Sequence, residues 1–488
     1  DFIFTSIAEE FGLAGTAALL ILLAMLVVRG FLIAIRAGSN FRRLLAAGIA
    51  AYFGAQAILI IGGNLRLLPL TGVTLPFVSY GGSSLLTSYL ALLILTQISN
   101  ELDQEPAALP QPAPYLHLAG LLSLGIAACA LTNGWWATWR SDDLLIRTDN
   151  PRRAIADRFV ARGNLLDRQN RAITTTQGEI GSYQRLYLVP DLSPITGYTH
   201  PIYGQAGLEQ TVDPYLRGLQ GLPTFQIWFE HLLYGQPPQG LDVRLSLDLE
   251  IQAIADAQLG QNAGAVILMN AETGEILAMA SHPAYDANQL DENIFSAPNA
   301  PLLNRSTQAL YPAGEIVTPF LQAQYGTETV SARERTSLYQ KLGFYETPTL
   351  RLPVAAARQS NETDIRLSPA QLIRGAAALS HLGICPAGQL IMAVEIPTQG
   401  WVVLPPLGEA TQCLRAEGVE ALMRAETRSF WQYTGSSESA PAQGVTWFMG
   451  GTTPGWQGTP LAVVVVLEKN DRPRAQTIGL AVLEAAIR

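Results

Sequence analysis

Four apolar segments in the first 140 residues set the strongest limit on how this 488-residue chain can fold. They lie at residues 13–35, 44–63, 83–98 and 116–136. At about 1.5 Å of rise per residue, segments of this length can cross a bilayer as helices, although the third needs help from residues 75–82. The fourth ends in tryptophans typical of a membrane–water interface, at 135, 136 and, just beyond it, 139. The sequence therefore predicts a multi-pass membrane protein with a helical N-terminal bundle.

The charges between these segments predict their orientation. Three arginines in residues 36–43 place that loop in the cytoplasm, because cytoplasmic loops are enriched in Arg and Lys. Counting spans puts the acidic, proline-rich linker at 100–114 on the same side and everything after about residue 140 outside the cell. Residues 65–84 contain two prolines and a Gly-Gly pair, so they cannot form a simple helix. This segment is either a functional element or an ordinary extracytoplasmic loop.

The remaining residues predict a globular α+β region. A strand is expected at 243–247, a helix at 249–259, a hairpin at 263–280, a buried strand at 461–467 and a final helix at 475–487. A net charge of −9 without a Lys/Arg run argues against a nucleic-acid partner. The three cysteines have no metal-site spacing. Cys385 and Cys413 form a disulfide if this region is exported, or remain two unpaired buried thiols.

Residues 1–99 resemble the C-terminal part of the FtsW/RodA (SEDS) family of peptidoglycan glycan polymerases. The resemblance rests on the strings DFIF at 1–4, LPLTG at 68–72 and LPFVSYGGS at 75–83. It departs from the family at Ile60, where Asn is usual, and at Arg66, where a small residue is common. Most of the family's earlier helices do not occur in this sequence, so we expect that it is a fragment or processed product and that this stretch does not polymerise glycan alone.

This resemblance implies a polymerase site that acts on lipid II. Asp1 matches the family's extracytoplasmic general base, although a lone carboxylate at a helix start is otherwise usually a cap. Glu9 is a candidate contact for the substrate or a lipid head group. The other implied substrate-binding residues are Ser79, Tyr80, Gly81, Gly82 and Ser83. No cofactor or protein metal site is implied, and a divalent cation is compatible with the polymerase chemistry.

Residues 115–488 resemble class B penicillin-binding proteins. The strings that carry this resemblance, in the family's order, are RGNLLDR at 162–168, YGQAGLE at 203–209, TGEILAMAS at 273–281, YPAG at 311–314, LSPAQL at 367–372 and WFMG at 447–450. The resemblance implies a membrane anchor at 115–139 and a β-rich pedestal at 140–240. It also implies an α+β transpeptidase-like domain, of the serine β-lactamase type, at 241–488.

The three catalytic elements of a penicillin-binding transpeptidase are missing from their expected places. Its Ser-x-x-Lys should follow YPAG, where this chain has Glu315 and Thr318; an alternative alignment deletes three residues and also removes the nucleophile. Its Lys-Thr-Gly becomes Tyr433-Thr434-Gly435, in which Thr-Gly is either a remnant or simply a small pair that a strand edge requires. No Ser-x-Asn occurs, and neither of the two lysines, at 341 and 469, follows a serine by three positions. We therefore predict a degenerate domain, against a weaker hypothesis that Glu315 is a substitute nucleophile.

Together these resemblances predict a bacterial plasma-membrane protein of cell-wall synthesis. It would join a SEDS-type polymerase to a non-catalytic penicillin-binding module that activates or positions it. Its expected partners are lipid II, nascent glycan strands, membrane lipid and other elongation or division proteins. The alternatives are a non-enzymatic structural component of the cell-wall machinery and a divergent D,D-transpeptidase.

Overall fold

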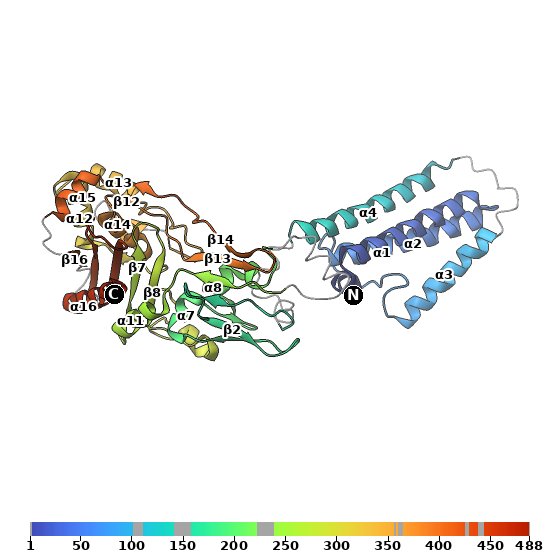
Figure 1. The fold of residues 1–488 in the computed structure, drawn as a ribbon. Coiled ribbons are helices and arrows are strands. Elements are labelled where there is room, and N and C mark those ends of the chain that lie inside the picture. Colours follow the sequence, from blue (N-terminus) through green and yellow to red (C-terminus); the bar gives the residue numbers. More distant parts are fainter. Residues whose placement is uncertain are drawn as a thin grey trace. The chain divides into compact units, whose positions relative to one another are not determined.

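The chain folds into two compact units, Asp1–Arg147 and Thr148–Arg488 (Figure 1). The computed structural model describes residues 2–100, 111–140, 158–221, 239–355, 365–424, 429–437 and 444–487, with the backbone alone at 358 and 359. The predicted catalytic residue Asp1 and most of the predicted linker at 100–114 lie outside the described residues.

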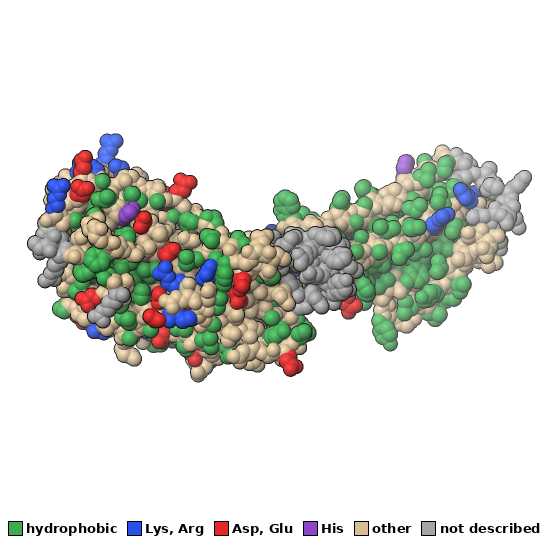
Figure 2. All heavy atoms as spheres, in the orientation of Figure 1, with side chains coloured by type: hydrophobic (Ala, Val, Ile, Leu, Met, Phe, Trp, Pro, Cys, Tyr) green, Lys and Arg blue, Asp and Glu red, His purple; other side chains and the backbone are tan. Residues whose placement is uncertain are grey.

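Four long helices form the first unit: α1 (Ile3–Arg36), α2 (Asn40–Asn64), α3 (Gly82–Asn100) and α4 (Ala113–Thr138). All four are long and apolar enough to cross a membrane, with mean hydropathies of 2.8, 2.1, 1.3 and 1.7 over their most apolar stretches. Figure 2 shows apolar side chains over much of the visible face of these helices. The predicted spans are thus confirmed as helices, each longer at both ends than the apolar pattern indicated.

α1 is interrupted at Gly12, which has φ 60° and ψ −157°. A residue without Cβ adopts this conformation at little cost, so the helix can change direction there. Beyond the break, Gly30 of α1 lies against Ala50 of α2, where an added Cβ would be only 2.6 Å from the Ala50 Cβ. Asn133 of α4 donates a hydrogen bond of 2.8 Å to Thr16 of α1 in the buried interior. Close backbone approach and a polar link between helices are both typical of membrane bundles.

A five-stranded antiparallel sheet forms the centre of the second unit, in the strand order β16-β17-β18-β7-β8. The inner strands are almost wholly buried, which explains why residues 461–467 are continuously apolar. The predicted hairpin and buried strand are confirmed. The bounds are β16 (Phe430–Ser437), β17 (Val445–Thr452), β18 (Leu461–Leu467), β7 (Gly264–Asn270) and β8 (Ile276–His282).

Helices cover both faces of this sheet (Figure 1). Side chains alternate between the faces of a strand, so Ile267 and Val464 enter one core with α12 (Thr318–Tyr325) and α14 (Pro369–Ser380). Val266 and Val463 enter the opposite core with α11 (Leu249–Leu259) and α16 (Arg472–Ile487). The predicted helix at 249–259 is α11, and the final helix begins three residues earlier than predicted.

A smaller sheet, in the order β1-β6-β13-β14, joins the first part of the second unit to its later residues. The predicted strand at 243–247 belongs to it as β6 but ends at Leu245. The elements of this region are β1 (Leu165–Leu166), β2 (Thr174–Gln177), β3 (Gln184–Tyr187), η1 (Pro190–Leu192), α7 (Ser193–Thr196), β4 (Thr199–His200), β5 (Gly204–Gln205), α8 (Gly207–Thr211), α9 (Asp213–Leu216), β6 (Val243–Leu245), β13 (Ile391–Ile396) and β14 (Gly400–Val403).

The other short elements lie around the large sheet. They are η2 (Ala287–Gln289), η3 (Glu292–Ser296), β9 (Tyr311–Pro312), η4 (Gly314–Val317), α13 (Ala332–Lys341), β10 (Arg358–Gln359), β11 (Ile365–Leu367), β12 (Ile384–Cys385), β15 (Thr411–Gln412) and α15 (Ala416–Met423). Cys385 and Cys413 form a disulfide, which decides between the two alternatives that the sequence left open.

Candidate functional site

The segment between α2 and α3 has the irregular backbone that its prolines and glycines predict. Phe77 lies in the middle of it with φ 65°, a conformation that costs free energy in a residue with a Cβ. Its ring contacts Phe53 of α2 and Tyr89 of α3, at centroid distances of 5.2 and 5.5 Å. These aromatic contacts hold the segment against both helices.

Three polar side chains extend this connection. Gln56 Nε2 of α2 donates to Thr74 Oγ1 at 3.1 Å, and Thr74 Oγ1 shares a hydrogen bond of 2.6 Å with Ser84 Oγ of α3. Ser79 Oγ accepts from the Leu75 backbone nitrogen at 2.8 Å and is buried. Ser79 therefore stabilises the turn itself.

The predicted substrate-binding residues differ in their access to a ligand. Tyr80 is fully exposed, and Gly81, Gly82 and Ser83 lead into the first turn of α3 at the surface. Glu9 lies on a separate element, exposed on the short helical segment before Gly12. Residues 79–83 thus run from the end of the irregular segment into α3, and their role in binding stays a prediction.

In the second unit, the predicted transpeptidase positions come together where η4 meets the edge strand β16. Gly314 has φ +54°, and a Cβ there would lie 2.8 Å from the Ser436 carbonyl oxygen. A Cβ on Gly435 would lie 2.8 Å from the Ile316 nitrogen. Both glycines allow the turn and the strand to approach this closely, so Gly435 has a structural reason to be small.

An ion pair occupies the position expected for the nucleophile. Glu315 Oε2 accepts a hydrogen bond of 2.9 Å from Arg472 Nη2, and the same nitrogen donates to Ser436 Oγ at 2.5 Å. Arg472 is the first residue of α16, 157 positions from Glu315. No sequence pattern relates two residues so far apart, and neither Arg472 nor Ser436 was predicted to be part of this site.

The side chains at the predicted transpeptidase positions each make other contacts in the structure. Acyl transfer usually employs a hydroxyl or thiol beside a group that removes its proton. Here Glu315 binds a guanidinium, Thr318 begins α12 half-buried, and Tyr433 is half-buried against the core. Lys469, one of the two lysines of the chain, forms an ion pair of 2.9 Å with Asp471.

The pedestal strings are explained by a buried network of charges. Arg162 donates to Glu209 Oε2 at 2.8 Å and to Asp213 Oδ1 at 2.6 Å, and Arg185 donates to Glu209 Oε1 at 2.7 Å. The network joins the strings at 162–168 and 203–209, and its members are buried or nearly so. Charge-assisted pairs of this kind fix the geometry of the elements that carry them.

A second buried pair joins α11 to β8. His282 Nε2 and Asp256 Oδ1 are 2.9 Å apart, and His282 Nδ1 is 2.9 Å from the Gly260 carbonyl oxygen. Burial lowers the pKa of His282, but the hydrogen bond and charge of Asp256, with smaller contributions from Gly260 and Asp191, raise it above the usual value overall. Both ring nitrogens are engaged by acceptors, so this His–Asp pair is arranged as a structural contact and not as a general base.

Two family models match separate parts of the chain. Residues 1–104 match the FtsW/RodA/SpoVE model, described as a cell cycle protein, and residues 264–324 match the penicillin binding protein transpeptidase domain. The peptidoglycan glycosyltransferase RodA of Mycobacterium tuberculosis is 46% identical over 100 residues, which is 20% of this chain and 21% of the relative. The probable peptidoglycan glycosyltransferase FtsW of Bacillus subtilis is 43% identical over 115 residues, 22% of this chain and 28% of the relative. The chain therefore spans between a fifth and a third of the length of these relatives.

The solved structures that resemble the chain match its second unit. Penicillin-binding protein A from M. tuberculosis, as an imipenem acyl-enzyme complex, has a TM-score of 0.58 at 20% identity and covers 68% of this chain and 100% of its own. A D,D-transpeptidase domain from Eggerthella lenta has a TM-score of 0.56 at 17% identity, covering 67% and 98%. The second unit has the penicillin-binding transpeptidase fold. At these identities the likeness concerns the fold alone.

The predicted fold class is thus confirmed: apolar helices related to FtsW/RodA proteins precede an α+β penicillin-binding fold. The apolar helices and these membrane-protein relatives identify an integral membrane protein. The matched transpeptidase segment ends at residue 324, so it includes Glu315 and Thr318 but not residues 433–435.

Proposed function

We propose that this chain works in bacterial cell-wall synthesis as a SEDS-type glycan polymerase part joined to a penicillin-binding module that does not transfer acyl groups. The observation that carries the proposal is the Glu315–Arg472 ion pair at the position expected for the nucleophile in a penicillin-binding fold. The substrate of the polymerase part would be lipid II, as the similarity to peptidoglycan glycosyltransferases supports.

The pedestal supports a role in positioning for the second module. Its buried network of Arg162, Glu209, Asp213 and Arg185 is intact, while the catalytic positions carry other chemistry. A domain that lost all function would not be expected to retain this network while losing only the reactive groups. Joining the two modules in one chain replaces an encounter between separate proteins by a high effective concentration.

The proposed topology places the second unit outside the cell. The Cys385–Cys413 disulfide supports this orientation, because structural disulfides persist in oxidising compartments and are rare in the cytoplasm. The arginines at residues 36, 42 and 43 support it from the other side of the membrane.

Labelling with a fluorescent penicillin tests the absence of acyl transfer. We expect no labelled band from the full chain in detergent, beside an active transpeptidase that labels under the same conditions. If the wild-type protein gives a labelled band and Glu315→Gln does not, the protein has the rival function, that of a divergent transpeptidase with a carboxylate nucleophile. Glu315 is exposed, so this variant is expected to fold.

Polymerisation of lipid II by the native protein tests the other half of the proposal. We expect Asp1→Ala to abolish glycan synthesis and deletion of residues 140–240 to reduce it strongly. Unchanged synthesis after the deletion would contradict the positioning role. No synthesis by the native protein under any condition would favour the second rival, a structural component of the cell-wall machinery without enzymatic activity.

A further inference from the structure

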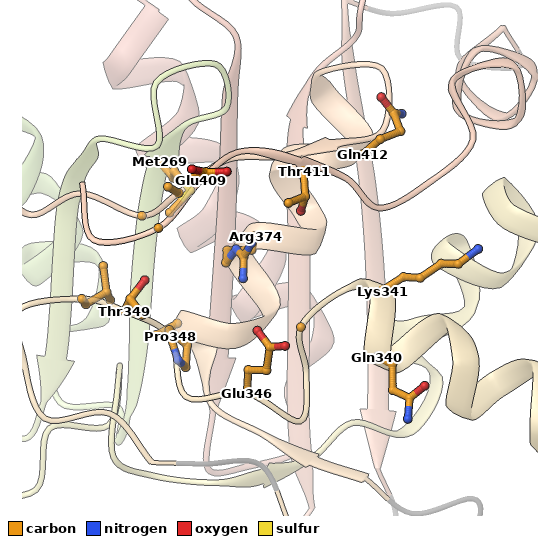
Figure 3. A pocket seen from close by; sticks show the side chains of 16 residues that line it. Met269, Gln340, Lys341, Glu346, Pro348, Thr349, Arg374, Glu409, Thr411 and Gln412 are labelled. Atoms are coloured by element: carbon orange, nitrogen blue, oxygen red, sulfur yellow. The ribbon is translucent and has the colours of Figure 1, made fainter. Parts of the chain in front are cut away.

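A cavity of about 430 Å³ opens on the second unit (Figure 3). The ends of β7, α13 and α14 line it, together with residues on both sides of the disulfide. None of its lining residues is among the predicted transpeptidase positions. Its volume lies in the range of about 300–1,000 Å³ that is usual for small-molecule sites.

Arg374 of α14 provides the cavity with a cation whose terminal N–H groups are available to a ligand. Its Nε donates to the Pro386 carbonyl oxygen at 3.1 Å, which fixes the plane of the guanidinium. Among the described residues, no hydrogen bond or ion pair is made by its two terminal nitrogens. Two parallel N–H groups of a guanidinium match the two oxygens of a carboxylate. Burial lowers the pKa of Arg374, and the charge of Glu346 offsets only part of this shift. The guanidinium remains protonated near neutral pH.

Gly343 keeps the space beside this guanidinium open. It has φ +71°, and a Cβ there would lie 2.9 Å from Arg374 Nη1. Any larger residue would therefore be strained itself and would push against the guanidinium.

The charges around the cavity are balanced. Arg374 and Lys341 line it together with Glu346 and Glu409. In the view of Figure 3, Arg374 reaches into the cavity between the two glutamates. A simple anion would be attracted by the arginine and repelled by the carboxylates, whereas a ligand with one charge of each sign could satisfy both.

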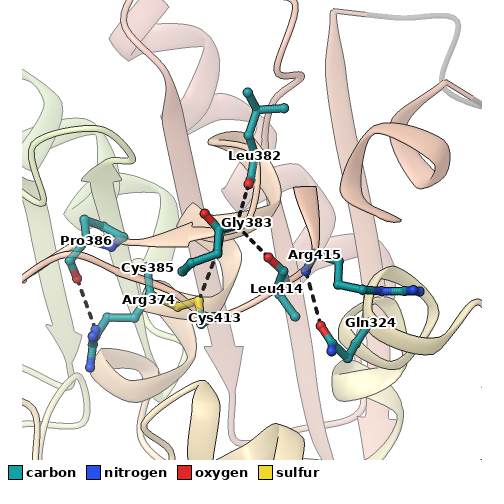
Figure 4. Close-up of a disulfide and its surroundings, with 10 residues drawn as sticks. Gln324, Arg374, Leu382, Gly383, Cys385, Pro386, Cys413, Leu414 and Arg415 are labelled. Carbon is teal, nitrogen blue, oxygen red and sulfur yellow. Dashed lines mark hydrogen bonds between the residues drawn. A yellow bond between two sulfur atoms is a disulfide. The ribbon is translucent and has the colours of Figure 1, made fainter. Parts of the chain in front are cut away.

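The disulfide holds two walls of the cavity together (Figure 4). Cys385 precedes Pro386, which orients Arg374, and Cys413 follows the lining residues Thr411 and Gln412. The backbone nitrogen of Cys413 also donates to the Gly383 carbonyl oxygen at 3.0 Å. Walls fixed in this way reduce the conformational entropy that the protein must lose when a ligand binds.

We propose that this cavity binds a small zwitterion of the amino-acid or dipeptide class. The ligand's carboxylate lies on the terminal nitrogens of Arg374, and its ammonium group is bound by the carboxylate of Glu346 or of Glu409, which flank that guanidinium. This inference does not depend on the proposed function, because it uses none of the residues of the polymerase or transpeptidase positions.

Calorimetric titration of the full chain in detergent tests the proposal with three probes. Glycylglycine carries both charges, N-acetylglycylglycine lacks the ammonium group, and glycylglycinamide lacks the carboxylate. We expect glycylglycine to bind at least tenfold more tightly than either blocked peptide. No detectable binding of glycylglycine, or equal affinity for glycylglycine and N-acetylglycylglycine, overturns the proposal.

Variants assign each charge to its residue. E346Q/E409Q changes two exposed side chains, so the fold is expected to persist. It should weaken binding of glycylglycine at least tenfold and should not weaken binding of N-acetylglycylglycine, because the two carboxylates that repel this anion are removed. R374Q should abolish binding of glycylglycine, and R333Q, which alters an exposed arginine of α13 outside the cavity, should have no effect. If E346Q/E409Q or R374Q binds glycylglycine as tightly as the wild-type protein does, the proposal is overturned.

Discussion

Removing the Cys385–Cys413 disulfide tests how the second unit is stabilised. The two cysteines are 28 positions apart and both are buried. A cross-link that closes a loop of this size reduces the entropy of the unfolded chain by an amount worth about 3.5 kcal/mol. We therefore expect the C385A/C413A variant to lose about 3–4 kcal/mol of its free energy of unfolding.

Urea unfolding of the full chain in detergent, followed by tryptophan fluorescence, measures this loss. Trp431 and Trp447 are buried in the second unit and report its transition. With a urea slope of about 3 kcal/mol per molar, the midpoint should fall by about 1 M. Reduced wild-type protein should behave like the variant.

Cys129 provides the matched control, because it is the free cysteine of α4 in the other unit. C129A should leave the transition of the second unit unchanged. An unchanged midpoint in C385A/C413A would refute the loop-closure reasoning.

Three further substitutions or conditions test contacts of the second unit through the same urea transition. Replacing Arg162 by methionine should cost about 3–5 kcal/mol, because Glu209 would lose a cation partner inside the protein. The pKa of His282 is raised in the folded state, so its ion pair with Asp256 stabilises the folded protein fully below the unfolded-state pKa of about 6.5. This stabilisation is lost as the pH rises through the folded-state pKa. The urea midpoint should therefore be higher at about pH 6 than at about pH 9. Gly435→Ala should cost about 1–3 kcal/mol, because the added Cβ would lie 2.8 Å from a backbone nitrogen of η4.

Each of these has its own control. Gly455→Ala adds a Cβ with nothing within 4 Å and should have a small effect. His282→Gln should remove the difference between the two pH values that His282 causes, and a difference of the same size in this variant would assign it to other groups. An exposed arginine such as Arg333, replaced by methionine, should not reproduce the cost expected at Arg162.

The elements that the sequence predicted well depend on local patterns. α11 and β18 have the predicted bounds, because capping by Asp248 and a continuous apolar run are visible in the residues themselves. The bounds of β6 and of α16 were less accurate, since pairing with β13 decides where β6 ends and packing against the sheet decides where α16 begins. In α1, the break depends on the conformation of Gly12, which a hydropathy pattern does not reveal.

The parts of the sites that were not predicted depend on long-range contacts. The positions of Glu315 and Gly435 followed from their motifs, and the structure brings them together. The pairing of Glu315 with Arg472 spans 157 residues. Likewise, the sequence did not decide whether Cys385 and Cys413 pair, because this depends on β12 lying beside β15. The cavity around Arg374 escaped prediction for the same reason.

Lys341 offers a site at which the chain can be labelled selectively. It is one of only two lysines, it is exposed, and it lines the cavity of Arg374, whereas Lys469 is held in an ion pair with Asp471. Limited treatment with an amine-reactive fluorophore should therefore modify Lys341 in preference to Lys469. The native sequence would then carry an optical reporter at the rim of the cavity, and ligand entry could be followed without introducing a new attachment site.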